Sequence, residues 1–265
     1  MSQTQRRYAA LDYDLLLSAA AELGYGLLES GAEIYRVEES IQRFLQAYGV
    51  LQADPFVIPN CIIVSFMTPE GKTMTQVRRM PSHGTDVDLL ERYNDLCRRL
   101  CREKPPLPQV RSSLSELRRT RRSYSPPALL GAYFIGIAAF TLFFGGSLRD
   151  ALCGGLCGFS VGLALHGMTL LHANLFFKSM LGSALAAFLA QALTALGLGE
   201  HPQIITIAAF MALVPGIIFT NAIRDVMAGD MVAGLSKIAD ALLTGVAVAL
   251  GAGFALTLAR LFWGV

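Results

Sequence analysis

The sequence predicts an α-helical polytopic membrane protein with about five transmembrane helices and a small cytoplasmic α+β domain at its N-terminal end. Of its 265 residues, 53% are hydrophobic, and the mean hydropathy of +0.47 is too high for an ordinary soluble enzyme. Charge is unevenly distributed, because 17 of the 22 Lys and Arg residues and 15 of the 20 Asp and Glu residues precede Pro126. The remainder of the chain contains apolar stretches of membrane-spanning length.

The N-terminal part of the chain shows alternating helical and β patterns that predict a small α+β domain. Apolar residues recur at the helical period in three stretches, residues 13–30, 33–48 and 86–103. Three β-like runs lie between them, at residues 53–58, 61–68 and 73–79, and Pro-Glu-Gly-Lys at 69–72 indicates a hairpin turn. No apolar signal-peptide core opens the chain, so we expect residues 1–104 to form a cytoplasmic domain.

Residues 105–126 are rich in proline and arginine and are expected to link this domain to the membrane half, with a short basic helix over residues 110–122. Five arginines directly precede the first apolar run: Arg111, Arg118, Arg119, Arg121 and Arg122. A basic block in this position favours lipid headgroups over nucleic acid as its partner and favours a cytoplasmic location. Residues 127–265 are then expected to form the transmembrane domain.

Five apolar stretches of this domain are long enough to cross a bilayer. They cover residues 128–146, 151–171, 179–198, 203–219 and 241–259. With the arginine block inside, five crossings leave the N-terminus in the cytoplasm and the C-terminus outside. The expected location is therefore the bacterial inner (cytoplasmic) membrane, with a multi-pass topology.

Small residues repeat at every fourth position in two of these spans. The repeats are Gly154, Gly158 and Gly162 in the second span, and Gly245, Ala249 and Gly253 in the fifth. Lipid offers no hydrophobic drive for helix association, and small residues let helix backbones approach closely. We therefore expect both stripes to contact neighbouring helices.

The stretch around residues 211–245 places polar and charged groups between two membrane-length segments. Its candidate substrate or transport residues are Pro215, Gly216, Thr220, Asn221, Arg224, Asp225, Asp230, Lys237 and Asp240. Ionisable groups in or near lipid are expensive and mark functional sites by default. The alternative is a cytoplasmic hairpin whose charges are solvated, or a simple ion pair between helices.

The residues after Pro215 could form a substrate-binding cavity at a break in the helix. A helix break at Pro215 and Gly216 is cheap, because proline has no N–H and glycine is conformationally permissive. Asn221 and Arg224 would then line a polar cavity at the break, together with Asp225. Arg224 could bind a substrate carboxylate in a bidentate manner, whereas Asp225 or Asp240 could bind an amino group or carry a coupling proton.

The sequence offers little support for catalysis or metal binding. The chain has no GxSxG, HExxH or P-loop motif, so we expect no catalytic residues. Cys97 and Cys101 are four residues apart, as are Cys153 and Cys157, but neither pair has metal-ligand spacing. We interpret these thiols as packing groups and expect no metal site and no cofactor.

Two motifs carry a resemblance to a known family. Residues 30–39, with the sequence SGAEIYRVEE, resemble the N-terminal signature of the threonine/serine exporter family (ThrE N-terminal region). Residues 215–240, which include NAIRD at 221–225, resemble the membrane motif of that family. The candidate motif residues of the cytoplasmic domain are Gly31, Glu33, Tyr35, Arg36 and Glu38. Glu33 and Arg36 are three residues apart on one helix and are expected to form a surface salt bridge.

The resemblance implies a function and a partner. Full-length members carry a second membrane half, so this chain resembles the split, YjjP-type members, which are taken to work with a second small membrane subunit. The implied activity is export of small acids, either threonine and serine or a dicarboxylate such as succinate. A second five-span half would be inverted, and the transport site of such repeats lies between the halves.

Two other functions remain open at this level: a membrane-anchored regulatory or scaffolding protein, and a membrane-tethered hydrolase. The expected partners are the second subunit, a small carboxylate or amino-acid substrate and the lipid bilayer, with no nucleic acid.

Overall fold

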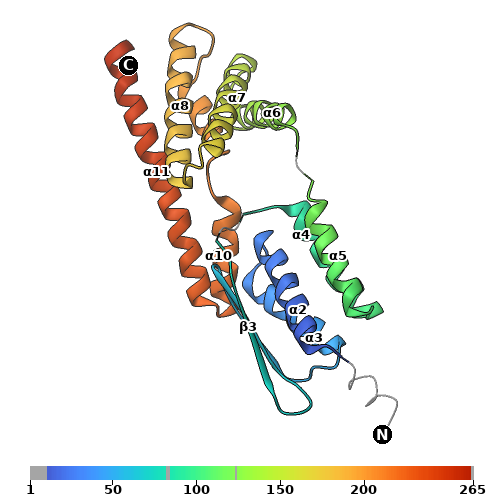
Figure 1. The fold of residues 1–265 in the computed structure, drawn as a ribbon. Helices are drawn as coiled ribbons and strands as arrows, with labels where there is room; N and C mark the ends of the chain where they lie inside the picture. The colour runs from blue at the N-terminus through green and yellow to red at the C-terminus, as the bar shows by residue number, and fades with distance from the viewer. Residues whose placement is uncertain (1–10, 82–83, 123, 264–265) are drawn as a thin grey trace. The chain divides into compact units, whose positions relative to one another are not determined.

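A computed structural model describes residues 11–81, 84–122 and 124–263 (Figure 1). The chain forms two compact units. The first, which we call the α+β unit, comprises Met1–Arg122 and Phe219–Ile238. The second, the helical unit, comprises Ser123–Ile218 and Ala239–Val265. The two ends of the predicted domains, residues 1–10 and 264–265, lie outside the described residues.

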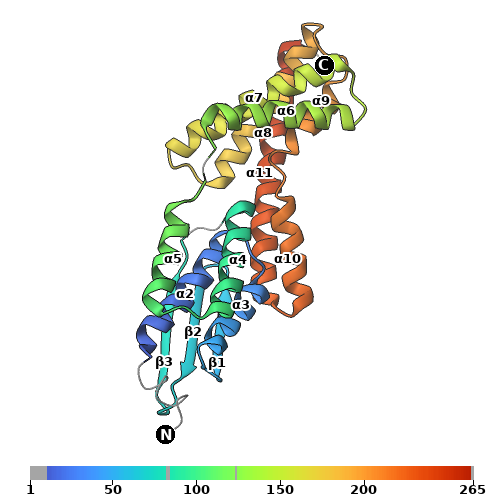
Figure 2. The ribbon, with the colours of Figure 1, turned by 90° about the vertical axis from the view of Figure 1, so that its right-hand side faces the viewer.

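The α+β unit contains a three-stranded antiparallel sheet in the order β1-β2-β3. Its strands are β1 (Ala53–Ile58), β2 (Cys61–Met67) and β3 (Thr73–Arg79). On β2, Ile62, Val64 and Phe66 are buried while the residues between them are partly exposed, as expected for a strand with one covered face. The helices are α2 (Tyr13–Glu29), α3 (Ile34–Ala47) and α4 (Val87–Glu103), and they lie on one side of the sheet in Figures 1 and 2.

Residues 105–126, expected to be a linker, contain a helix that belongs to the α+β core. Helix α5 (Leu107–Arg119) buries Leu107, Val110 and Leu114 in the same cluster as α2 and α4. The Tyr48 hydroxyl donates to the Pro105 carbonyl over 2.7 Å. The apolar residues three and four apart give α5 an amphipathic face, so this basic segment packs as well as linking.

The helical unit holds most of the apolar sequence. It contains α6 (Pro126–Phe143), α7 (Leu148–Leu170), α8 (Leu175–Ala195) and the short α9 (Pro202–Phe210). By length and composition, four described helices could cross a membrane: α6, α7, α8 and α11 (Met231–Trp263). Helix α11 begins ten residues before the expected fifth span.

The expected fourth span, residues 203–219, is divided in the structure. Helix α9 ends at Phe210, a turn follows, and α10 (Gly216–Ala228) begins directly after Pro215. Proline cannot donate a backbone hydrogen bond, and its ring clashes with the preceding helical turn, so one continuous helix through this point is disfavoured. The break therefore falls at the Pro-Gly step.

The two small-residue stripes have different surroundings. A Cβ atom placed on Gly154, Gly158 or Gly162 of α7 would collide with residues of α6, so this stripe is a helix contact as expected. The stripe on α11 makes no such contact within the described chain, because no described residue lies within 4 Å of such an atom on Gly245 or Gly253. The close contact of α11 is made by Gly251, against the Met180 carbonyl of α8. Gly251 and Gly253 are two residues apart on α11, so they face directions that differ by about 200° around the helix axis.

Candidate functional site

The polar stretch after Pro215 forms a tight helical hairpin from α10 and the start of α11, which lie side by side in Figures 1 and 2. Gly229 makes the turn with a φ of 100°, in the left-handed region that glycine tolerates best. A Cβ atom on Gly234 of α11 would lie 2.9 Å from the Ala222 carbonyl of α10. This close approach turns Asp225 and Lys237 towards each other inside the hairpin.

Asp225 is the buried centre of the site, with an exposed fraction of 0%. Its Oδ2 atom pairs with the Lys237 ammonium over 2.6 Å, and Lys237 is itself only 7% exposed. Its Oδ1 atom accepts the backbone N–H of Ile34, the first residue of α3, over 3.1 Å. Glu33 at the N-cap of α3 makes no side-chain capping bond, so Asp225 supplies the missing acceptor from α10.

Arg224 extends the contact to the same helix end. Its Nη1 atom donates to Glu33 Oε1 over 2.9 Å, while Arg36 Nε lies 3.3 Å from Glu33 Oε2. One helical turn before Asp225, Asn221 donates to the Gly31 carbonyl over 3.2 Å. Glu33, Arg36, Arg224, Asp225 and Lys237 together form what we call the charged network. It joins the two sequence motifs within the α+β unit.

The balance of forces on Glu33 favours the ionised form. Burial by itself raises the pKa of Glu33, but hydrogen bonds from its own backbone N–H and from Arg224, together with the Arg36 charge, lower it overall. The side chain is therefore a carboxylate at neutral pH, as its two arginine partners require. Nearby, burial raises the pKa of both Glu38 and Asp230, and each is raised further by a neighbouring carboxylate.

The remaining predicted residues lie around the network or apart from it. Glu38 accepts the Val57 N–H over 2.8 Å, and exposed Tyr35 contacts the Arg36 guanidinium. Thr220 and Asp240 are exposed, and Asp230 is half-buried in the turn after Gly229. Pro215 and Gly216 belong to the helical unit, at the start of α10.

The geometry differs from two expectations. Asp225 does not face an open cavity, because its two oxygens are taken by Lys237 and Ile34 and its side chain is fully buried. Glu33 and Arg36 do pair, but this is not a simple surface bridge, since Glu33 is 7% exposed and shared with Arg224. Within the network, Arg224 and Arg36 are open to solvent, each with 57% of its side chain exposed.

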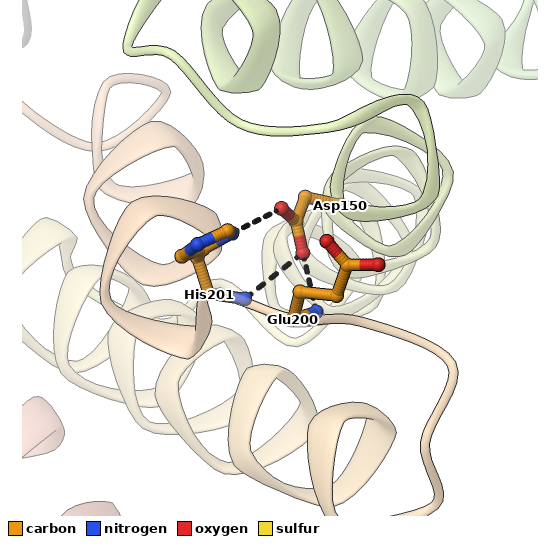
Figure 3. A group of neighbouring side chains, drawn as sticks. All are labelled: Asp150, Glu200 and His201. Carbon is orange, nitrogen blue, oxygen red and sulfur yellow. Dashed lines mark hydrogen bonds and ion pairs between the residues drawn. The ribbon is translucent and has the colours of Figure 1, made fainter.

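Sequence patterns missed a second polar cluster, which lies in the helical unit (Figure 3). Asp150 is fully buried at the start of α7, where it forms a capping box with Ser147. Its oxygens also accept the backbone N–H groups of Glu200 and His201, over 2.7 and 3.0 Å, and lie 2.8 Å from the His201 ring Nδ1. The Ser-x-x-Asp spacing was the available local signal, but nothing local pointed to His201.

Asp150, Glu200 and His201 bring possible metal-ligand atoms within 4.8 Å of one another. However, both Asp150 oxygens are already occupied by protein donors from Ser147, Glu200 and His201. The cluster therefore ties the loop before α7 to the loop before α9.

Four long apolar helices and a mostly helical chain define a multi-pass membrane protein. Residues 18–259 match the family model of the putative threonine/serine exporters, and the chain belongs to this family. It is 22% identical over 241 residues to a probable threonine/serine exporter of Mycobacterium tuberculosis. It is 24% identical over 247 residues to the probable succinate transporter subunit YjjP of Klebsiella aerogenes. No solved structure matches the chain.

The two relatives differ in how much of them the chain covers. The match takes in 89% of this chain but only 45% of the mycobacterial protein, so the chain spans less than half of that relative. It takes in 90% of this chain and 90% of the Klebsiella protein. In length, the chain thus corresponds to the relative that is named as a subunit.

Proposed function

We propose that this chain is one subunit of an exporter of small acids in the bacterial inner membrane, completed by a second small membrane subunit. The substrates are threonine and serine, or a dicarboxylate such as succinate. Family membership supports export, and the similar length of the relative named as a transporter subunit supports a two-subunit assembly. The single observation that carries the proposal is the Arg224–Glu33 pair, in which the exposed arginine already binds a carboxylate.

The grouping of segments in the α+β unit supports an additional crossing before α10. Residues 219–238 pack with the described part of the N-terminal half, residues 11–81 and 84–122, in one unit, so both segments are expected on the same side of the membrane. Three crossings, by α6, α7 and α8, would leave the chain on the opposite side. A fourth crossing must therefore lie between Ala195 and Phe219, where α9 and the turn before Pro215 are found. We propose that this segment crosses as a broken helix, which makes five crossings with α11.

This topology predicts the location of reporter fusions. A fusion after Glu116 should give a cytoplasmic signal, a fusion within residues 197–200 an external signal, and one after Phe262 an external signal. The reason is that the basic block before α6 stays inside and the number of crossings is odd. A cytoplasmic signal after Phe262 would contradict the fifth crossing, while an external signal after Glu116 would reverse the orientation.

In the proposed mechanism, the substrate carboxylate exchanges with Glu33 on Arg224. A planar guanidinium binds one carboxylate much as it binds another, through charge-assisted hydrogen bonds. The arginine side of the Arg224–Glu33 pair is exposed to a substrate, and Glu33 keeps Arg36 as a partner when Arg224 releases it. Asp225 and Lys237 then act as the buried support that holds α10 against α3. Substrate binding and the position of the α3 end are thereby coupled.

Export by reconstituted vesicles tests both the two-subunit export function and the role of Arg224 in binding the substrate. We expect efflux of threonine, serine or succinate only when this chain and its partner subunit are present together. Arg224→Lys keeps the charge but loses the planar fork, so efflux should fall about tenfold, as expected for a lost charged hydrogen bond. The matched control is Arg149→Lys, because Arg149 also pairs with a glutamate but lies in the helical unit.

Two outcomes distinguish a failure of the export function from a failure of Arg224 as the substrate contact. If the wild-type assembly moves none of these acids, the proposed function fails. If the assembly exports and Arg224→Lys behaves like Arg149→Lys, the function stands and Arg224 is not the substrate contact.

A further inference from the structure

A groove of about 710 Å³ lies between α3 and α4 in the α+β unit, on residues outside the proposed substrate contact. It is lined by four arginines, Arg36 and Arg43 from α3 and Arg98 and Arg102 from α4. Glu39 is the one acidic residue among its lining residues. Its ion pair with Arg43 is exposed on both sides, as is the pair that Arg98 makes with Asp95, so both can open readily. The groove thus offers cationic groups to a small anion.

Two thiols lie in the same groove, one helical turn apart on α4. Cys97 is buried, whereas Cys101 is half-buried and reaches the groove surface. The Cys97 thiol donates to the Ser40 carbonyl over 3.8 Å. The hydrogen bond to Cys101 and burial raise the pKa of Cys97. The same hydrogen bond, with the charges of Arg43 and Lys104, lowers the pKa of Cys101 below its usual range.

We propose that Cys101 is a modification site, at which a small anionic disulfide forms a mixed disulfide while its carboxylates bind the groove arginines. The Cys101 thiolate attacks one sulfur of the reagent, the reagent's S–S bond breaks, and the other half leaves as a thiolate that takes a proton from water. The reagent is the oxidant, so no further electron acceptor is required. A second small thiol reverses the step by attacking the adduct.

The groove is connected to the charged network through Arg36. This residue lines the groove and also lies 3.3 Å from Glu33, the partner of Arg224. An anionic adduct on Cys101 would compete with Glu33 for Arg36. The modification itself does not depend on the export proposal, but it gives the groove a physical route to the proposed substrate contact.

The test uses the full-length chain and three disulfide reagents of different charge: glutathione disulfide, hydroxyethyl disulfide and cystamine. Adduct formation at each cysteine is followed by peptide mass at pH 7. With the neutral reagent, Cys101 should react faster than Cys61, because its lowered pKa enlarges the thiolate fraction. Cys61 is the internal comparator, since it is also half-buried. At Cys101 the anionic reagent should react fastest and the cationic one slowest.

Matched variants isolate the groove. Arg43→Gln should reduce the preference of Cys101 for the anionic reagent several-fold, because it removes a charge that faces the thiol. Arg99→Gln should leave the preference unchanged, because Arg99 is on the same helix but does not line the groove. Equal rates at Cys101 and Cys61, no charge preference at Cys101, or equal effects of the two variants would each overturn the proposal.

Discussion

Asp225→Asn is expected to destabilise the folded chain by about 3–5 kcal/mol, because it leaves the Lys237 ammonium buried without its partner charge. Asparagine retains an oxygen in the place that accepts the Ile34 N–H, so the variant removes the charge and little else. Lys237 is 7% exposed and cannot reach water without opening the hairpin of α10 and α11. Thermal or denaturant unfolding of the full-length chain in detergent measures the effect.

A second variant separates lost charge from lost shape. Asp225→Asn combined with Lys237→Met removes both charges, and replacement of a whole buried pair is often nearly neutral. We expect the double variant to recover most of the stability that the single variant loses. Arg224→Gln serves as the control, because its pair with Glu33 is exposed on one side and should contribute about 1 kcal/mol or less. Equal unfolding of Asp225→Asn and wild type would show that Lys237 is not held as an ion.

The burial of Asp225 changes how transport variants should be interpreted. From the sequence, both Arg224 and Asp225 are candidates for direct substrate contact, and Asp225→Asn could be expected to affect transport alone. In the structure, Asp225 supports the site from within, so its loss would lower transport through folding and assembly. Arg224 is the member of the network whose substitution reports on substrate binding with little structural damage.

Local patterns predicted much of the α+β fold. β1 and β3 have the expected limits, and β2 ends one residue early, at Met67. These elements depend on alternation, helical period and turn residues, all of which act within a few positions. The cap of α4 is also local, since Asp86 accepts the Leu89 N–H three residues later. By contrast, a short basic helix was expected over residues 110–122, but its short apolar stripe did not lead us to expect that it packs into the core.

The site could be predicted only in part, because its contacts are long-range. Glu33 and Arg224 are 191 residues apart, and no local pattern joins them. The sequence singled out both residues, one through each motif, but not their pairing. Asp150 was missed as a candidate because its partner His201 is 51 residues away. Polar residues that are distant in sequence but in contact in the fold can be recognised as a site only from the tertiary structure.

Helix α11 illustrates the same limit for packing. A repeat of small residues at every fourth position identifies a face that could contact a neighbour, but α11 carries small residues on several faces. Gly251 is buried and approaches the backbone of α8 at Met180, next to the cluster of Ala187, Ala252 and Ala255. Gly253 lies on a different face and is exposed. The contact face is set by the neighbour that is present, and the repeat alone does not specify it.

Gly251→Ala is therefore expected to weaken the packing of α11 against α8, whereas Gly253→Ala should be tolerated. The added methyl group at Gly251 would collide with the Met180 carbonyl and the Ser183 hydroxyl. A backbone carbonyl in a helix cannot rotate away as a long side chain can, so the two helices must separate, at a cost of about 1–3 kcal/mol. At Gly253 no described residue lies within 4 Å of the added atom, and alanine also improves helix propensity. Unfolding of both variants in the same detergent compares them directly. If Gly251→Ala is as stable as Gly253→Ala, then α8 and α11 do not pack closely at Gly251.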